Sequence, residues 1–178
     1  LLYAGRLVPD KGVEELLDAL RLLVRRDSRY RLSLIGKGSP NYVRILKRKV
    51  RKHRLTRHVR WLGQYKPDRL QRAYRRYGAV IMPSKRESFG LVALEALAAG
   101  VPLVSTRSGG LRRFVNRRVA QVIPKTEPRA IAAAIQAMQN APQRTRRRVL
   151  AGKKIAARYR WSDAAAHYRK VFAKTAMK

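Results

Sequence analysis

Residues 79–105 read AVIMPSKRESFGLVALEALAAGVPLVS, and this segment divides into a strand, a helix and a second strand. Ala79–Met82 is short and apolar, and Leu91–Ala99 is an apolar helix that Gly100 ends. The next segment, Val101–Ser105, is again short and apolar. Short apolar strands joined by a helix are typical of a parallel sheet that is buried on both faces.

The same alternation of strands and helices continues on both sides of this segment. The further predicted strands are Leu1–Gly5, Arg31–Ile35, Val59–Leu62 and Val119–Ile123. The further predicted helices are Val13–Arg26, Asn41–Arg54, Asp68–Tyr77, Pro128–Asn140, Arg144–Tyr159 and Ser162–Lys174. We therefore expect an α/β fold, a Rossmann-like doubly wound parallel sheet with helices on both faces and a helical C-terminal tail. No linker or repeat interrupts the pattern, so we expect one domain over residues 1–178.

The composition excludes several classes of site. The 178 residues contain no cysteine, which excludes a disulfide scaffold, a thiol nucleophile and a cysteine-ligated zinc site. Three scattered histidines leave little room for a histidine metal centre, and we predict no metal. No apolar run approaches the roughly 18 residues of a membrane span. We expect a cytoplasmic protein, with peripheral attachment to an anionic membrane as an alternative.

The charge is unusual: 43 Lys and Arg against 10 Asp and Glu give a net charge of +33. The basic residues are spread over the whole chain, which favours a solvated, highly charged surface without one cognate polyanion. A specific nucleic-acid site and an anionic membrane or lipid-linked acceptor remain alternatives. At low salt we expect non-specific binding to nucleic acid.

Ligands of such a sheet bind beyond the carboxyl ends of the strands, so the loops that follow strands are the candidate sites. The first loop runs from Gly5 to Gly12 and carries Arg6 and Lys11 just before a predicted helix. Two cations beside a helix N-terminus suit an anion, although an ordinary turn with surface charges is the alternative. The second loop, Gly36–Gly38, allows close approach of a backbone to a ligand, or is a plain turn.

The third loop precedes the helix at Leu91 and contains Glu87. Glu87 and Glu95 are the only acidic residues between Asp68 and Glu127. The free N–H groups of residues 88–91 would face a ligand oxygen, and the two carboxylates could accept hydrogen bonds from sugar hydroxyls. The alternative is an acid at a helix start together with a surface Glu paired to an Arg.

Taken together, these loops resemble a known family. The motifs are Gly-Arg-Leu-x-x-x-Lys-Gly at 5–12, Gly-x-Gly at 36–38 and Glu-Ser-Phe-Gly-Leu-x-x-x-Glu-Ala at 87–96, with Gly109-Gly110 and Arg160-Trp161-Ser162 as further landmarks. They are similar to the C-terminal, donor-binding half of the retaining glycosyltransferases with the GT-B fold, family four (glycosyl transferases group 1).

The resemblance implies a role for each matching residue. Arg6 and Lys11 would hold the diphosphate of a nucleotide-sugar, Glu87 would take hydroxyls of the donor sugar, and Glu95 would bind the ribose. We expect Glu87, Arg6 and Lys11 to be catalytic. The other donor-binding residues implied are Gly5, Gly36, Gly38, Leu62, Ser88, Phe89, Gly90 and Leu91. The family needs no cofactor or metal beyond its nucleotide-sugar substrate, and UDP is the nucleotide we expect.

The resemblance also has limits. Gly78 and Arg113 stand where the family commonly has Asp and Glu. The family's acceptor-binding half is missing from these 178 residues, so we expect a donor-binding hexosyltransferase domain with little activity in isolation, its other half supplied separately. The alternative is a polyanion-binding module on a glycosyltransferase scaffold, or a variant of that scaffold whose surface charge has been changed to strongly positive.

Overall fold

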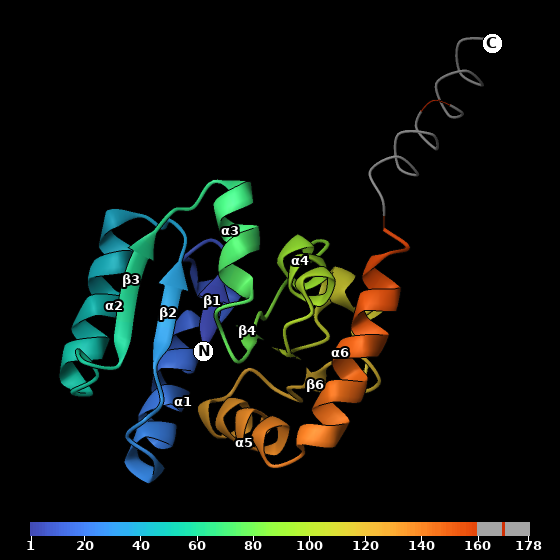
Figure 1. The fold of residues 1–178 in the computed structure, drawn as a ribbon. Coiled ribbons are helices and arrows are strands. Elements are labelled where there is room, and N and C mark those ends of the chain that lie inside the picture. Colours follow the sequence, from blue (N-terminus) through green and yellow to red (C-terminus); the bar gives the residue numbers. More distant parts are fainter. Residues whose placement is uncertain (160–168, 170–178) are drawn as a thin grey trace.

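A computed structural model describes residues 1–159 and residue 169 (Figure 1). The strands are β1 (Leu2–Ala4), β2 (Leu32–Ile35), β3 (Val59–Gly63), β4 (Val80–Met82), β5 (Leu103–Ser105) and β6 (Gln121–Val122). The α-helices are α1 (Val13–Arg26), α2 (Pro40–Lys52), α3 (Pro67–Tyr74), α4 (Leu91–Ala99), α5 (Pro128–Gln139) and α6 (Pro142–Ala156). Two 3-10 helices are η1 (Pro9–Lys11) and η2 (Gly109–Arg113). The predicted helix over 162–174 and the landmark at 160–162 lie outside the described residues.

All strand pairs are parallel, and the sheet order is β3-β2-β1-β4-β5-β6. The chain builds outward from β1 to β3, then returns to the other side of β1 to add β4, β5 and β6. The direction of winding therefore changes between β1 and β4, which leaves a crevice at the carboxyl ends of these two strands. This topology confirms the predicted doubly wound α/β fold.

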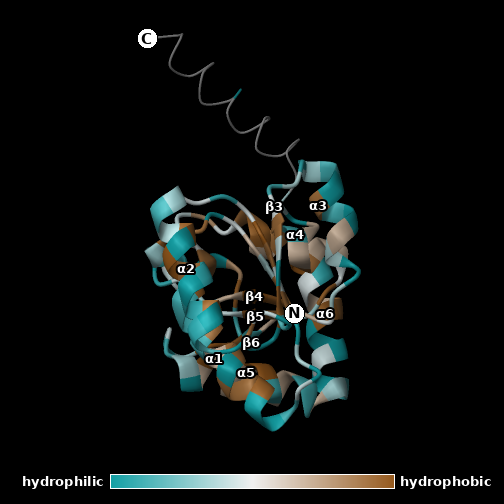
Figure 2. Ribbon diagram, turned by 90° about the vertical axis from the view of Figure 1, so that its left-hand side faces the viewer, coloured by the Kyte–Doolittle hydropathy of each residue, from teal (hydrophilic) through white to brown (hydrophobic). Residues whose placement is uncertain are grey.

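Helices cover both faces of the sheet (Figure 2). On one face α1, α2 and α5 enclose one apolar core, and on the other α3, α4 and α6 enclose a second. The sequence explains the arrangement of α1, because its buried residues recur at three- and four-residue spacing. They are Val13, Leu16, Leu17, Ala19, Leu20 and Leu23.

The order of elements agrees with the prediction, but several boundaries differ. Helix α3 ends at Tyr74, three residues before the predicted end, where its fully buried ring anchors the helix to the core. Strand β6 has two residues where five were predicted, because the N–H groups of Val119 and Ala120 bond to the Asn116 carbonyl in a turn. No helix in residues 1–159 is both long and apolar enough to cross a membrane.

Candidate functional site

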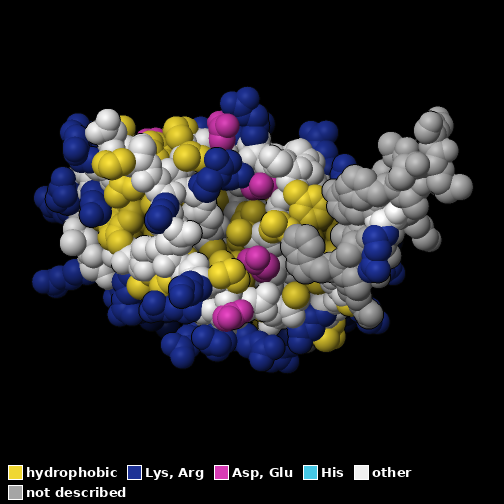
Figure 3. Space-filling model, turned by 90° about the horizontal axis from the view of Figure 1, so that it is seen from above, with side chains coloured by type: hydrophobic (Ala, Val, Ile, Leu, Met, Phe, Trp, Pro, Cys, Tyr) yellow, Lys and Arg dark blue, Asp and Glu magenta, His cyan; other side chains and the backbone are white. Residues whose placement is uncertain are grey.

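A cavity of about 330 Å³ opens at the crevice between β1 and β4. Its walls come from the loop after β1 and from the loop that joins β4 to α4. The lining residues are Tyr3, Ala4, Gly5, Arg6, Lys11, Met82, Ser84, Glu87, Ser88, Phe89, Gly90, Leu91 and Val92. Figure 3 views the molecule from the side to which the strands point: acidic and apolar side chains lie near the middle, with Lys and Arg around the edge.

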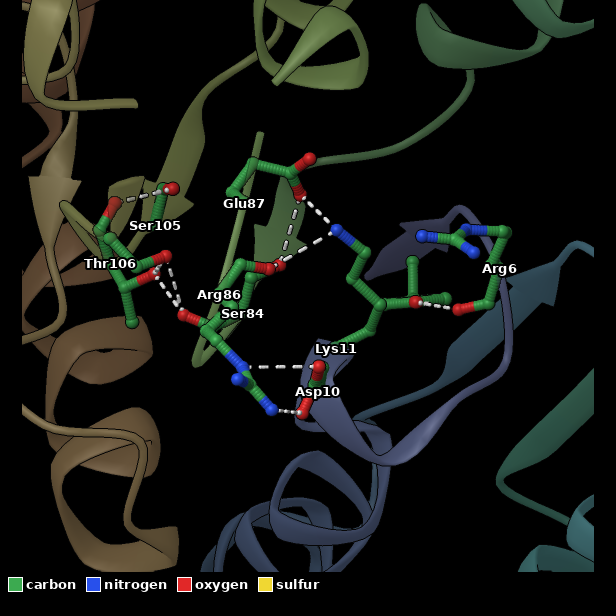
Figure 4. Close-up of polar contacts among 10 residues, drawn as sticks. Arg6, Asp10, Lys11, Ser84, Arg86, Glu87, Ser105 and Thr106 are labelled. Atoms are coloured by element: carbon green, nitrogen blue, oxygen red, sulfur yellow. Dashed lines mark hydrogen bonds and ion pairs between the residues drawn. The ribbon is translucent and has the colours of Figure 1, made fainter. Parts of the chain in front are cut away.

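An ion pair between Lys11 and Glu87 joins the two walls of the cavity (Figure 4). Lys11 Nζ lies 2.6 Å from Glu87 Oε2, and the two side chains are only 13% and 15% exposed. The same ammonium donates to the Arg86 carbonyl at 3.3 Å, and Ser84 Oγ donates to Glu87 Oε2 at 3.4 Å. Glu87 Oε1 has no hydrogen-bond partner among the described residues, so it can accept from a ligand.

Arg6 adds a second cation to the cavity wall. Its backbone carbonyl accepts a hydrogen bond of 2.6 Å from the Tyr3 hydroxyl. Burial, together with the nearby Tyr42 and Glu87, raises the pKa of Tyr3 above its usual range, so this hydroxyl keeps its proton and remains a donor. The Arg6 side chain is exposed and makes no hydrogen bond or ion pair within the described chain. Its guanidinium faces the same space as the Lys11 ammonium (Figure 4) and is available to an anion.

The first turn of α4 contributes backbone donors. Helix α4 has Gly90 at its N-cap and no side chain that caps it. The N–H groups of Leu91 and Val92 find no backbone acceptor in the described residues. Free N–H groups at a helix N-terminus favour a negatively charged ligand oxygen, and here they lie in the wall of a cavity with two cations.

Two hydroxyl groups after β5, one of them on the buried Thr106, hold the loop that carries Glu87. Thr106 Oγ1 and Ser108 Oγ both donate to the Ser84 carbonyl, at 2.7 and 2.8 Å. The sequence alone does not single out Thr106 or Ser108, because serine and threonine after a strand are too common to indicate a role. The structure identifies them as residues that position Glu87 without touching the cavity.

A close backbone contact also fixes this loop from the other side. The Gly110 N–H donates to the Glu87 carbonyl at 2.8 Å. A Cβ at Gly109 would lie 2.0 Å from the same carbonyl oxygen, and Gly109 has a φ of +52°. Only glycine fits there without displacing Glu87. The Gly109-Gly110 pair noted in the sequence therefore acts on the site through Glu87.

An aromatic cluster that no sequence motif indicates packs against the cavity wall. The Phe89 ring lies 6.1 Å from the rings of Phe114 and Tyr159, measured between centroids. Tyr159 follows α6, so this contact ties the end of α6 to the loop before α4. The three residues are 25 or more positions apart, which hides the cluster from any local pattern.

The structure brings together eight of the twelve predicted site residues. Lining this cavity are Gly5, Arg6, Lys11, Glu87, Ser88, Phe89, Gly90 and Leu91. Glu95 does not line it: its Oε2 accepts a hydrogen bond of 2.7 Å from the Tyr74 hydroxyl. Leu62 packs against the core beneath α3 and α4.

The two glycines of the second predicted loop lie behind the cavity wall. A Cβ on Gly36, whose φ is +148°, would meet the Gly5 carbonyl oxygen at 1.8 Å. A Cβ on Gly38 would meet the Leu7 carbonyl oxygen at 2.3 Å. The loop after β2 therefore packs against the backbone of the loop after β1 and supports the residues beside Arg6.

The side chains of this part of the chain offer little to a metal ion. Residues 1–159 and 169 contain no group of three or more His, Asp or Glu that could hold one. The chemistry available in the cavity is that of cations, one carboxylate and backbone N–H groups.

Comparison with known proteins connects this geometry to one family. The family model described as glycosyl transferases group 1 matches residues 1–155. The chain is 34% identical over 167 residues to a glycogen synthase of Mycobacterium tuberculosis, covering 93% of this chain and 40% of that protein. It is 32% identical to D-inositol 3-phosphate glycosyltransferase 2 of Catenulispora acidiphila, covering 98% of this chain and 43% of that protein.

Solved structures share the fold. A sucrose-phosphate synthase from Thermosynechococcus elongatus superposes with a TM-score of 0.85 at 28% identity, over 97% of this chain and 45% of that one. The Anabaena protein Alr3699/HepE, solved in complex with UDP-glucose, gives a TM-score of 0.81 at 25% identity, over 88% of this chain and 43% of that one. The chain thus spans less than half of the length of these relatives.

Proposed function

Because the chain belongs to the glycosyl transferases group 1 family, we propose that it is the nucleotide-sugar donor-binding half of a retaining hexosyltransferase. One observation carries the proposal: Arg6, Lys11 and Glu87, from two loops far apart in the chain, line one cavity where the sheet changes its direction of winding. That crevice is where open α/β sheets bind nucleotides.

The cations and the helix N-terminus fit the leaving group of such a transfer. When the bond between the sugar and the diphosphate breaks, the nucleoside diphosphate gains negative charge. Arg6, Lys11 and the free N–H groups of α4 would stabilise that charge more in the transition state than in the ground state. Lys11 is already held by its ion pair with Glu87, and the N–H groups are fixed in the first turn of α4, so these two contributors need little reorganisation.

Glu87 would orient the sugar. Its Oε2 is held by Lys11 and Ser84, whereas Oε1 is free to accept a hydrogen bond from a hydroxyl of the donor. We place the ribose at Glu95, where the Tyr74 hydroxyl holds one carboxylate oxygen and leaves the other available. UDP is the nucleotide we propose, supported by the UDP-glucose complex of the Anabaena protein.

The acceptor would bind to another half. Since the chain spans less than half of its relatives, we propose that a second domain supplies the acceptor site and that turnover by this part alone is slow. Binding of the donor is therefore a better test of the chain than transfer.

Calorimetric titration with UDP, GDP and ADP tests the donor site. We expect a preference for UDP and a loss of affinity of at least about tenfold in Arg6→Ala and in Lys11→Ala, because each removes a charge-assisted hydrogen bond to phosphate. Arg147→Ala is the matched control, since Arg147 is exposed and lies outside the cavity. Equal losses in all three variants would show that UDP binds only to diffuse surface charge.

The net charge of +33 supports a second candidate function, a polyanion-binding module on the same scaffold. This function predicts tight binding of RNA or DNA with a steep salt dependence and no competition by a nucleotide-sugar. Titrations with a labelled oligonucleotide over a range of salt and with UDP separate the two candidates: a polyanion-binding module binds the oligonucleotide tightly and does not bind UDP, whereas a donor-binding domain binds UDP and retains the oligonucleotide only at low salt.

A further inference from the structure

Arg148 of α6 is the most deeply buried charged residue in the described part of the chain, at 7% exposure. Its Nε donates to the Arg117 carbonyl at 3.1 Å, and its Nη1 donates to Gln121 Oε1 at 2.6 Å. Both acceptors are neutral. Nη2 makes no hydrogen bond with any described residue, so the guanidinium keeps donors to spare.

A buried cation ordinarily has an anionic partner, because removing a charge from water costs several kcal/mol. Arg148 has none within the described residues. Instead, burial and the positive charge of Arg144 lower the pKa of Arg148 from its usual range. Surface recharging accounts for arginines that face water, but it does not account for an arginine that is only 7% exposed and has no counter-charge among the described residues.

Arg148 lines a cavity of about 460 Å³ between α5, α6 and the segment around β6, elements that lie together in Figure 1. Arg117 and Arg144 also line it, and among residues 1–159 no Asp or Glu does. The rest of the wall is largely apolar, with alanines of α5 such as Ala133 and Ala137. This cavity shares no residue with the wall of the donor cavity.

We propose that this cavity binds the phosphate group of a small phosphomonoester, with its apolar body against the alanines of α5. A phosphomonoester carries close to two negative charges at neutral pH and three acceptor oxygens. The planar guanidinium groups of Arg144 and Arg148 match that geometry, and the phosphate supplies a counter-charge that the described residues do not provide. The site is independent of the proposed donor site.

Phenyl phosphate is a suitable probe, with inorganic phosphate and phenol as partial ligands. Titration in about 0.15 M NaCl, where long-range surface attraction is largely screened, should give one saturable site. Phenyl phosphate should bind more tightly than inorganic phosphate, and phenol should not bind. The Arg148 Nε–Hε resonance in ¹H–¹⁵N spectra should shift as the site fills.

Variants separate this site from the surface and from the donor cavity. We expect Arg144→Gln, a change at an exposed residue, to weaken phenyl phosphate about tenfold by removing one charge-assisted contact. Arg148→Lys keeps the positive charge but removes the planar guanidinium with its paired N–H donors. We therefore expect a similar loss of affinity for phenyl phosphate. Arg147→Gln on the same helix and Lys11→Ala should each change the affinity by less than about twofold, and Arg144→Gln should leave UDP binding unchanged.

Three results would overturn the proposal. Equal effects of Arg144→Gln and Arg147→Gln would assign the binding to diffuse charge, and loss of binding in Lys11→Ala would place the phosphate in the donor cavity. The third result comes from measuring binding to vesicles that contain phosphatidic acid. Arg144-dependent binding to these vesicles without binding of phenyl phosphate would assign the phosphate to a lipid and contradict a small-molecule ligand.

Discussion

Lys11 and Glu87 lie 76 positions apart in the chain and meet across the mouth of the crevice at 2.6 Å. Each side chain is largely buried, so each needs the other's charge. The same two groups are the ones we expect to contact the donor. The pair therefore links the stability of the site to its capacity to bind.

Glu87→Gln tests this link through stability. The substitution leaves the Lys11 ammonium buried beside a neutral amide, and we expect a loss of about 3 kcal/mol in the free energy of unfolding. Urea unfolding followed by circular dichroism measures it. Glu127→Gln is the control, because Glu127 is 62% exposed and 3.9 Å from Lys125, and should change stability by less than about 0.5 kcal/mol. Similar effects of the two substitutions would mean that the Lys11–Glu87 pair contributes no more to the free energy of unfolding than an exposed ion pair does.

Some site residues could be predicted from the sequence and others could not. Arg6, Lys11 and Glu87 were identifiable because charged residues in loops after strands must meet at one edge of a parallel sheet. The contact between Glu95 and Tyr74 was not identifiable, because it depends on where α3 ends relative to α4. Buried Arg148 was equally hidden, since it sits in a run of arginines whose other members are exposed.

At the scale of elements, the 3-10 helix η2 shapes the loop between β4 and α4. Gly109 passes so close to the Glu87 carbonyl that a side chain there would collide with the backbone of the site. Thr106 and Ser108, which follow β5, hold the start of the same loop through the Ser84 carbonyl. Glu87 is therefore placed by the elements on both sides of it.

Gly109→Ala should disturb both stability and donor binding. We expect a loss of more than about 2 kcal/mol, because a positive φ and a clash with backbone both oppose alanine. Gly78→Ala is the matched control: nothing lies within 4 Å of its added Cβ and its φ is not positive. It should be neutral or stabilising by up to about 1 kcal/mol. Thermal unfolding and UDP titration of both variants measure the difference, and equal stability of the two would show that the site does not need glycine at position 109.

The boundaries of elements were harder to predict than their order. Apolar runs indicated the strands, but a run such as Val101–Ser105 is longer than the ladder it forms, which is Leu103–Ser105. The pattern reports burial, and residues beside a strand can be buried without pairing. Val101, for example, is buried just before β5.

At the scale of the molecule, the charge of +33 acts against the compact state. Two well-packed cores must outweigh this repulsion. The sequence predicted a sheet buried on both faces and a highly charged surface. It could not show which of the many arginines is buried. Only the three-dimensional arrangement makes that distinction.

Salt should stabilise the protein by screening this repulsion. Raising NaCl from about 0.02 to 0.3 M shortens the screening length to below about 10 Å, and we expect the melting temperature to rise by about 5 °C. Calorimetric scans measure the shift, and sucrose at matched osmolarity controls for effects of the cosolute. A melting temperature that falls with salt would show that favourable ion pairs outweigh the repulsion.

The proposed function requires a nucleotide-sugar to bind in the crevice between β1 and β4. A crystal structure of the protein soaked with UDP-glucose tests it most directly. We expect density for the diphosphate within hydrogen-bond distance of Arg6, Lys11 and the first turn of α4, with the sugar at Glu87. A nucleotide bound elsewhere on the surface, or an empty crevice at saturating UDP-glucose, would contradict it.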